Sequence, residues 1–186
     1  MRKFNGYEPK KASGGRELLP AGGYIAKILN AEEVQYDWGN VVVISFDILE
    51  GEHKGFFAKD YRAQTQEDKK WRGTYRLREP NDDGTEQDCW TKNAFNNAVW
   101  SLQESNPGYH FDWDEGKFKG KLVGVLFRNR EWEMDDGRTG WTTECCALTD
   151  VASIQNNTYK MPKDKPLAKK AAAAPAFPPV EEDEGD

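Results

Sequence analysis

The residues of this chain whose chemistry is most readily interpreted are aromatic rings set among cations. Residues 54–78 contain eight Lys and Arg side chains against three acids, and Tyr61, Trp71 and Tyr75 are interleaved with them. Cations can hold phosphates while rings stack on bases of any identity, which is what a single-stranded nucleic-acid groove requires. The alternative is a polar loop whose rings pack on the core, and this segment alone favours neither interpretation.

A second basic and aromatic patch follows in a predicted strand. Residues 117–130 carry five cations and no acid, and Arg128, Arg130 and Trp132 share one face of that strand. They share it because successive side chains of a strand point to opposite faces. The patch is interpreted either as a further part of a groove or as an ordinary solvated face with one covering Trp.

These patterns predict a binding site in which rings stack on bases and cations hold phosphates. The stacking candidates are Tyr36, Trp38, Tyr61, Trp71, Tyr75, Trp132 and Trp141. The phosphate-binding candidates are Lys59, Arg62, Lys70, Arg72, Arg76, Arg128 and Arg130.

Charge is distributed unevenly along the chain. The formal net charge of −6 argues against a uniformly basic nucleic-acid binder. Residues 79–115 carry nine acids and a single cation, Lys92, so this part of the chain should repel nucleic acid. Nucleic-acid binding therefore requires a bipolar domain with one positive and one negative side.

Signatures of catalysis are missing from the sequence. It has no GxxxxGK[ST], no GxSxG, no HExxH and no Cys/His cluster of metal-ligand spacing. The two histidines, His53 and His110, fall in predicted turns or loops. We predict no cofactor, no metal and no enzymatic activity. Three carboxylate pairs could hold Mg²⁺ in a nuclease, although turns explain them better: Asp82 with Asp83, Asp112 with Asp114, and Asp135 with Asp136.

The cysteines and the apolar runs predict a cytoplasmic, reduced protein. Cys89, Cys145 and Cys146 form no CxxC motif, and adjacent cysteines in a strand point to opposite faces, so a disulfide framework is not expected. No apolar run approaches the ~20 residues of a membrane span. No apolar signal segment follows Met1.

Three runs of strand-forming residues lie between Leu19 and Tyr61. The clearest is residues 41–48. Val42, Ile44, Phe46 and Ile48 alternate there with Val41, Val43, Ser45 and Asp47, as in a strand with one buried face. Runs at 24–29 and 56–61 are interpreted as the first and third strands. A change of phase after Leu29 and the Gly at position 124 are suitable places for a barrel strand to bend.

The second half of the chain predicts a helix followed by a hairpin. Thr91 is a candidate helix cap, and Asn106-Pro107-Gly108 ends the helix. Phe95, Ala98, Val99 and Leu102 form its apolar face. Two strands follow, joined by a turn at Asp135-Asp136-Gly137-Arg138.

This order of elements predicts a mainly β protein with the OB-fold, a five-stranded barrel with one helix between strands three and four. We expect a basic arm at residues 1–18, the OB-fold domain at 19–159, and a disordered linker with an acidic tail at 160–186. The tail is rich in Lys, Ala and Pro and cannot bury enough apolar area to offset its chain entropy.

The segments LPAGGYIAKI, ISFDILEGEHKG and FKGKLVGVLF resemble bacteriophage proteins of replication and recombination modules that are related to phage single-stranded DNA-binding proteins. The resemblance covers roughly residues 19–154, and its motifs are structural rather than catalytic. The acidic tip also resembles the C-terminal tails of single-stranded DNA-binding proteins, which contact replication partners. It ends in Glu-Gly-Asp, which is closer to the phage type of tail, and lacks the Pro-Phe end of the bacterial tails. The tip comprises Glu181, Glu182, Asp183, Glu184 and Asp186.

The leading hypothesis is therefore a sequence-nonspecific single-stranded DNA-binding protein of phage replication or recombination, without a membrane partner and compatible with self-association. Its acidic tip could occupy the basic groove when DNA is absent and bind replication or recombination proteins when DNA is present. Two alternatives stay open. One is an acidic protein-interaction adaptor whose aromatic residues contact a partner, and the other is a Mg²⁺-dependent nuclease.

Overall fold

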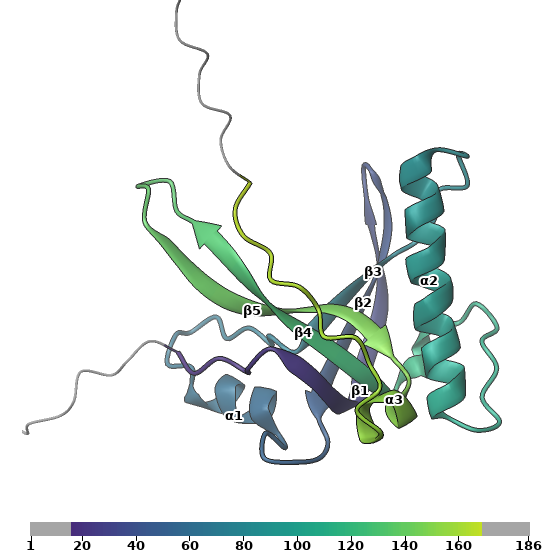
Figure 1. Cartoon of the computed structure of the whole chain (residues 1–186), viewed down its shortest axis with the longest axis horizontal. Helices are drawn as coiled ribbons and strands as arrows, with labels where there is room; N and C mark the ends of the chain where they lie inside the picture. The colour runs from purple at the N-terminus through teal and green to yellow at the C-terminus, as the bar shows by residue number, and fades with distance from the viewer. Residues whose placement is uncertain (1–15, 169–186) are drawn as a thin grey trace, which may run out of the picture.

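The computed structural model describes residues 16–168, which form one five-stranded antiparallel sheet with helices packed around it. The order of strands in the sheet is β3-β2-β1-β4-β5 (Figure 1). The elements are β1 Gly22–Tyr36, β2 Gly39–Ile48, α1 Phe56–Ala63, β3 Thr74–Arg78, α2 Glu86–Ser105, the 3-10 helix η1 Glu115–Phe118, β4 Leu122–Glu133, β5 Thr139–Thr149 and α3 Val151–Gln155. The mainly β prediction is confirmed.

The sheet is open, which corrects the prediction of a closed barrel. β3 and β5 are its two edges, and no strand pairing joins them in the described part of the chain. In Figure 1 the β4–β5 hairpin and the β1–β2–β3 strands diverge as two arms from a common base. Two strand edges with unpaired backbone groups therefore border the space between the arms.

β1 connects the two arms because it pairs with both neighbours. It pairs with β4 over Gly22–Lys27 and with β2 from Ala26 to Tyr36. The register of the β1–β2 pair shifts between Ile28 and Asn30, where a change of phase was predicted. A bulge of this kind bends a strand and lets it leave one partner for another.

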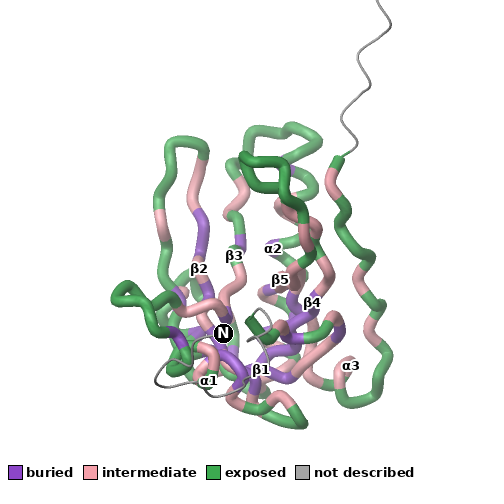
Figure 2. The backbone as a smooth tube through the Cα atoms, turned by 90° about the vertical axis from the view of Figure 1, so that its left-hand side faces the viewer, coloured by how far each residue is buried: buried purple, intermediate pink, exposed green. Residues whose placement is uncertain are grey.

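The core fills the base of the sheet, where the strands come together. Val42, Ile44, Phe46 and Ile48 are all buried, so the predicted alternation of β2 is confirmed. Figure 2 shows buried residues near this base and exposed residues at the tips of the strands. The base is thus the buried part of the fold, and the tips of the strands are exposed to solvent (Figure 2).

The predicted third strand, residues 56–61, is wrong because this segment is helix α1. Gly55 adopts a left-handed φ of 69°, and the Asp47 carboxylate of β2 then accepts hydrogen bonds from the amides of Phe57 (2.9 Å) and Ala58 (3.1 Å). These bonds satisfy backbone donors at the start of the helix. Phe56 and Phe57 pack into the core. The third strand of the sheet is instead β3, within the connection whose conformation the sequence left open.

Helix α2 is confirmed but begins earlier than predicted. Thr85, not Thr91, caps it, because the Thr85 hydroxyl accepts a hydrogen bond from the Asp88 amide (3.2 Å). Phe95, Ala98 and Leu102 are buried as expected. α2 contacts β3, β4 and β5, so it packs across the side of the sheet on which its two edges approach each other.

The chain after α3 returns to β4. Lys165 donates its amide to the Asn129 carbonyl (2.8 Å), and its carbonyl accepts from the Glu131 amide (2.9 Å). Asp164 accepts a side-chain hydrogen bond from Asn129 (3.0 Å), and the Leu167 amide donates to the Glu131 carboxylate (3.0 Å). The first part of the predicted linker therefore runs along β4, as the yellow segment in Figure 1.

Candidate functional site

The candidate site is an open cleft of about 810 Å³ bordered by the two edge strands, β3 and β5. We refer to it as the basic cleft. Its floor includes Phe56, Phe57 and Phe127. Its polar lining is Arg16, Lys70, Arg72, Thr74, Tyr75, Arg76, Arg78, Arg128, Arg130, Thr142, Thr143, Glu144 and Lys165. Eight cations and one carboxylate therefore face the cleft among the described residues.

These cations come from well-separated parts of the chain. Arg16 precedes the first strand, Lys70 and Arg72 lie between α1 and β3, and β3 itself contributes Arg76 and Arg78. β4 contributes two more, and the chain after α3 contributes Lys165. Like charges brought together at this density repel one another, so the fold maintains a positive potential that favours anionic ligands.

The one carboxylate of the cleft, Glu144 on β5, orients two of its arginines. Its Oε1 accepts from Arg128 Nη2 (2.7 Å) and Nε (2.9 Å), and its Oε2 lies 3.0 Å from Arg130 Nε. All three side chains are partly exposed, so the ion pairs contribute little to stability. Their effect is to position two guanidinium groups. Arg128, Arg130 and Glu144 together carry one net positive charge.

Asp60 of α1 plays the same role at the other end of the cleft. Its Oδ1 lies 3.1 Å from Arg72 Nη1 and 3.3 Å from Arg16 Nε. The carboxylate is 11% exposed. Burial and the neighbouring Arg72 lower the pKa of Arg16, although arginine remains charged at neutral pH. A guanidinium held in place loses less entropy when it binds a phosphate.

Two predicted stacking residues lie beside the cleft and contact its cations. The rings of Tyr36 and Trp38 stack at 5.0 Å with planes 7° apart, at the turn between β1 and β2. The Tyr36 hydroxyl accepts a hydrogen bond from Arg76 (3.0 Å), and Arg78 lies 4.6 Å from the centre of the Trp38 ring. Trp38 is 51% exposed and Tyr36 is 37% exposed, although Tyr36 and Arg78 already lie against the Trp38 ring. Only the part of this aromatic pair that Tyr36 and Arg78 leave uncovered is accessible to a base.

Trp71 and Tyr75 have structural roles that the sequence did not show. The Trp71 indole donates from Nε1 to the carbonyls of Phe46 (3.2 Å) and Gly73 (3.1 Å), and both rings pack against the core. Burial also raises the pKa of Tyr75 to about 12. Both residues border the cleft, but their packing restricts the ring faces that remain for stacking.

Three further predicted residues, Lys59, Tyr61 and Arg62, lie on α1 and do not line the basic cleft. Lys59 borders an adjoining hollow of about 460 Å³ that also includes Arg16 and Arg72. The Tyr61 ring lies 5.9 Å from the Trp71 ring, and all three side chains are exposed. Their part in binding stays a prediction.

Trp132 and Trp141 lie on the outer part of the β4–β5 hairpin. The half-buried Trp132 ring covers Gly140, where a β-carbon would come within 2.5 Å of the ring. Trp141 is 50% exposed. Neither residue lines the basic cleft, although both lie on strands that do.

The structure adds Arg16, Arg78 and Lys165 to the predicted cations. Arg78 could have been found, because it shares one side of the TYRLR strand with Arg76 while Leu77 is buried on the other. Arg16 and Lys165 carry no such local signal. They reach the cleft through long-range contacts, Arg16 with Asp60 and Lys165 with the backbone of β4.

The three predicted carboxylate pairs occupy loops or turns and engage local partners. Asp82 pairs with Lys92, and Asp112 and Asp114 with Lys117, while Asp83 accepts hydrogen bonds from Thr85 and Asp136 from Arg138. Within residues 16–168, no group of three or more His, Cys, Asp or Glu side chains is placed to hold a metal ion.

Two predicted features lie outside the described residues. These are residues 1–15 of the basic arm and the acidic tip with Glu181, Glu182, Asp183, Glu184 and Asp186. Contacts of the tip with partners, and its competition with nucleic acid, stay predictions.

Comparison of the chain with protein-family models and with curated proteins finds no match. The described helices include none that is long and apolar enough to cross a membrane. Function must therefore be argued from the geometry and charge of the site.

Proposed function

We propose that this protein binds single-stranded nucleic acid without sequence preference, in the basic cleft between β3 and β5. The observation that supports this most strongly is the convergence of cations from separate chain segments on one cleft beside the exposed pair Tyr36 and Trp38. Phosphates would bind the cations and bases would stack on the rings. Threonine hydroxyls and aromatic faces distinguish none of the four bases strongly, which fits binding without a sequence code.

Single strands fit this site better than a duplex. In a duplex the bases are already stacked on one another. An aromatic ring of the protein could therefore stack on a base only after its base pair had opened. In a single strand the bases are available, and each stacked base contributes about 1–3 kcal/mol. The resemblance to phage single-stranded DNA-binding proteins points to DNA of a phage replication or recombination module as the ligand.

We also infer that the sheet is an opened version of the predicted OB-fold. Its strand order places β3 and β5 at the two edges, and these edges contact each other across the cleft without pairing. Joining them would close a five-stranded barrel with α2 between the third and fourth strands. The OB-fold is itself a partly open barrel that presents strand faces and loops to oligonucleotides.

The proposal is tested by titrating the full-length protein with oligo-dT and following tryptophan fluorescence in the absence of Mg²⁺. We expect quenching that weakens as salt rises, with a log–log slope near −0.7 for each phosphate neutralised. The Arg76→Ala/Arg78→Ala double variant should bind more weakly and with a slope shallower by about 1.4.

A matched lysine pair controls for net charge. Lys70 lines the cleft, whereas the exposed Lys119 follows η1 and does not. Lys70→Ala should reduce affinity and Lys119→Ala should not. An equal loss of affinity in both variants would show that the net charge of the protein attracts oligo-dT without a defined site. No change in tryptophan fluorescence at low salt would refute nucleic-acid binding. Strand cleavage on adding Mg²⁺ would instead favour the nuclease alternative.

A further inference from the structure

A second hollow of about 530 Å³ lies where α2 meets the loop before η1. Its lining includes four aromatic residues, Phe95, Phe111, Trp113 and Phe118. A smaller hollow of about 280 Å³ adjoins it and shares the first three of these rings. We name the two together the aromatic groove. In the described part of the chain, no residue lines both this groove and the basic cleft.

Trp113 is held in the groove in an unusual conformation. It is 80% exposed, yet its ring stacks on Phe95 at 6.0 Å with planes 14° apart. Its φ of 65° lies in the left-handed region, which residues other than glycine rarely adopt. Lys117 pairs with both neighbours of Trp113, Asp112 and Asp114, and so fixes the loop. A strained backbone that presents a large ring to solvent suggests a functional demand on that ring.

The rim of the groove is acidic. Asn40 Nδ2 donates to Glu33 (2.9 Å) and to Glu79 (3.5 Å), so one amide brings two carboxylates together. Glu115 also lines the hollow. Burial chiefly, and the nearby Glu33 and Glu115 to a smaller extent, raise the pKa of Glu79.

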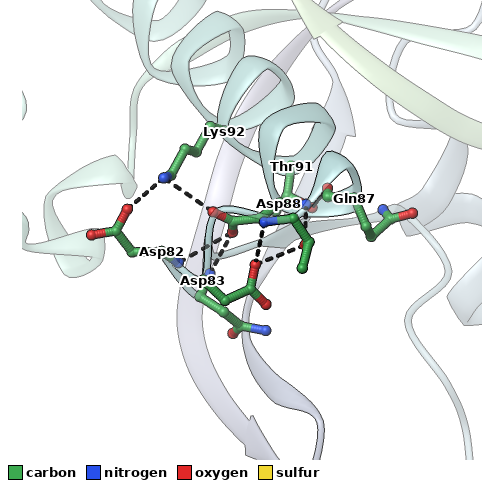
Figure 3. A network of polar contacts seen from close by, with 8 residues as sticks. Asp82, Asp83, Gln87, Asp88, Thr91 and Lys92 are labelled. Carbon is green, nitrogen blue, oxygen red and sulfur yellow. Dashed lines mark hydrogen bonds and ion pairs between the residues drawn. The ribbon is translucent and has the colours of Figure 1, made fainter.

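The one lysine of the groove lining, among the described residues, does not neutralise this rim. Lys92 Nζ lies 2.5 Å from Asp82 and 3.0 Å from the buried Asp88. Figure 3 shows Lys92 between these two carboxylates, at the start of α2. The groove therefore keeps a negative field that attracts cations and repels phosphates.

We propose that the aromatic groove docks a basic segment of a partner protein, with an aromatic or aliphatic side chain against Phe95 and Trp113 and flanking Lys or Arg side chains on Glu33, Glu79 and Glu115. The charge of the groove complements such a segment and opposes nucleic acid. Two adjoining hollows around a shared aromatic wall suit a peptide with successive side chains better than one small cation. Because its lining is separate from the cleft, the groove can hold a partner while nucleic acid is bound.

The experiment probes fluorescently labelled full-length protein on a synthetic peptide array in which one Phe, Trp or Leu is flanked by Lys and Arg. Control arrays replace the apolar residue by Ser or the cations by Glu. We expect binding to the basic, apolar-anchored peptides alone. Trp113→Ala should weaken it about tenfold or more, as for a central aromatic anchor. Trp90→Ala should not, since Trp90 is an exposed ring of α2 outside both hollows.

The charge requirement is tested in the same way. The Glu79→Gln/Glu115→Gln double variant should lose its binding to the basic peptides and the salt dependence of that binding. Glu104 is an exposed residue of α2 that does not line the groove, so Glu104→Gln should retain both. Oligo-dT binding by Trp113→Ala should equal that of the wild type, which shows that the variant is folded and separates this proposal from the first. The proposal is overturned if no array peptide binds, or if binding ignores Trp113. It is also overturned if the protein self-associates through Trp113 in sedimentation, because the occupant is then a second copy.

Discussion

At the scale of single residues, exposed and packed rings beside the cleft have different surroundings. Trp38 is half exposed and contacts Tyr36 and Arg78, whereas Trp71 hydrogen-bonds two backbone carbonyls and packs on the core. The sequence cannot separate the two, because both follow or precede charged residues in polar segments.

Replacing these two tryptophans should therefore give opposite results. Trp38→Ala should weaken oligo-dT binding by about 1–3 kcal/mol and leave the free energy of unfolding within about 0.5 kcal/mol of the wild type. Trp71→Ala should lower the free energy of unfolding by about 3 kcal/mol through lost packing and hydrogen bonds. Urea unfolding and fluorescence titration of both variants check this. A stable Trp71→Ala protein with impaired binding would contradict the structural role.

Glu144 limits the charge of the cleft. Glu144→Gln removes the carboxylate that Arg128 and Arg130 share, and we expect tighter oligo-dT binding at low salt with a log–log salt slope steeper by up to about 0.7. Glu104→Gln makes the same change in net charge outside the cleft and should leave the slope unchanged. Weaker binding by Glu144→Gln would mean that orientation of the two arginines matters more than their charge.

At the scale of elements, α1 depends on a cap from another part of the chain. Asp47→Ala leaves the amides of Phe57 and Ala58 without their acceptor and should lower the free energy of unfolding by about 1–2 kcal/mol. Chemical denaturation measures this, with the exposed Asp37→Ala as control. If the two variants are equally stable, the cap contributes nothing and α1 is held by Phe56 and Phe57 alone.

Helix α3 has a cap whose strength depends on pH. The Ser153 hydroxyl and amide hydrogen-bond the Asp150 carboxylate and lower its pKa below the ordinary 3.8. Because the folded-state pKa is depressed, this stabilisation is present above the unfolded-state pKa and is lost as pH falls through the folded-state pKa. Asp150→Asn keeps an acceptor that does not titrate in this range, so its melting temperature should fall less steeply below about pH 4. If the melting temperatures of Asp150→Asn and the wild type fall in parallel down to pH 3, to within about a degree, this prediction is refuted.

These elements show which parts of the structure the sequence could predict. Side-chain alternation identified β2, β4 and β5, because a period of two is a local property of a strand. The burial of β2 follows this alternation, whereas β4 is buried without a break from Val123 to Phe127. The six residues of FFAKDY have no such unambiguous period, and their helix is started by Asp47, ten positions upstream. Likewise Arg76 was predicted from local composition, but Arg16 and Lys165 enter the site through contacts with distant residues.

At the scale of the whole molecule, the basic cleft and the aromatic groove with its acidic rim share no lining residue among the described residues. Lysine acetylation read by mass spectrometry tests this separation. Saturating oligo-dT should protect Lys70 and Lys165 in the cleft several-fold, and it should leave Lys119 beside η1 unprotected. Equal protection of all three lysines would mean that nucleic acid wraps the protein instead of following the cleft.

The unpaired edges of β3 and β5 have a consequence for the proposed binding of nucleic acid. A tube closed on all sides must be threaded from an end, so a covalently closed circle could not load onto it. A trough bordered by two free strand edges can receive a strand from the side at any point along its length. If the cleft binds single strands as proposed, it should accept circular single strands, gaps within duplexes and the inside of replication bubbles, and neither loading nor release should need a free 5′ or 3′ terminus.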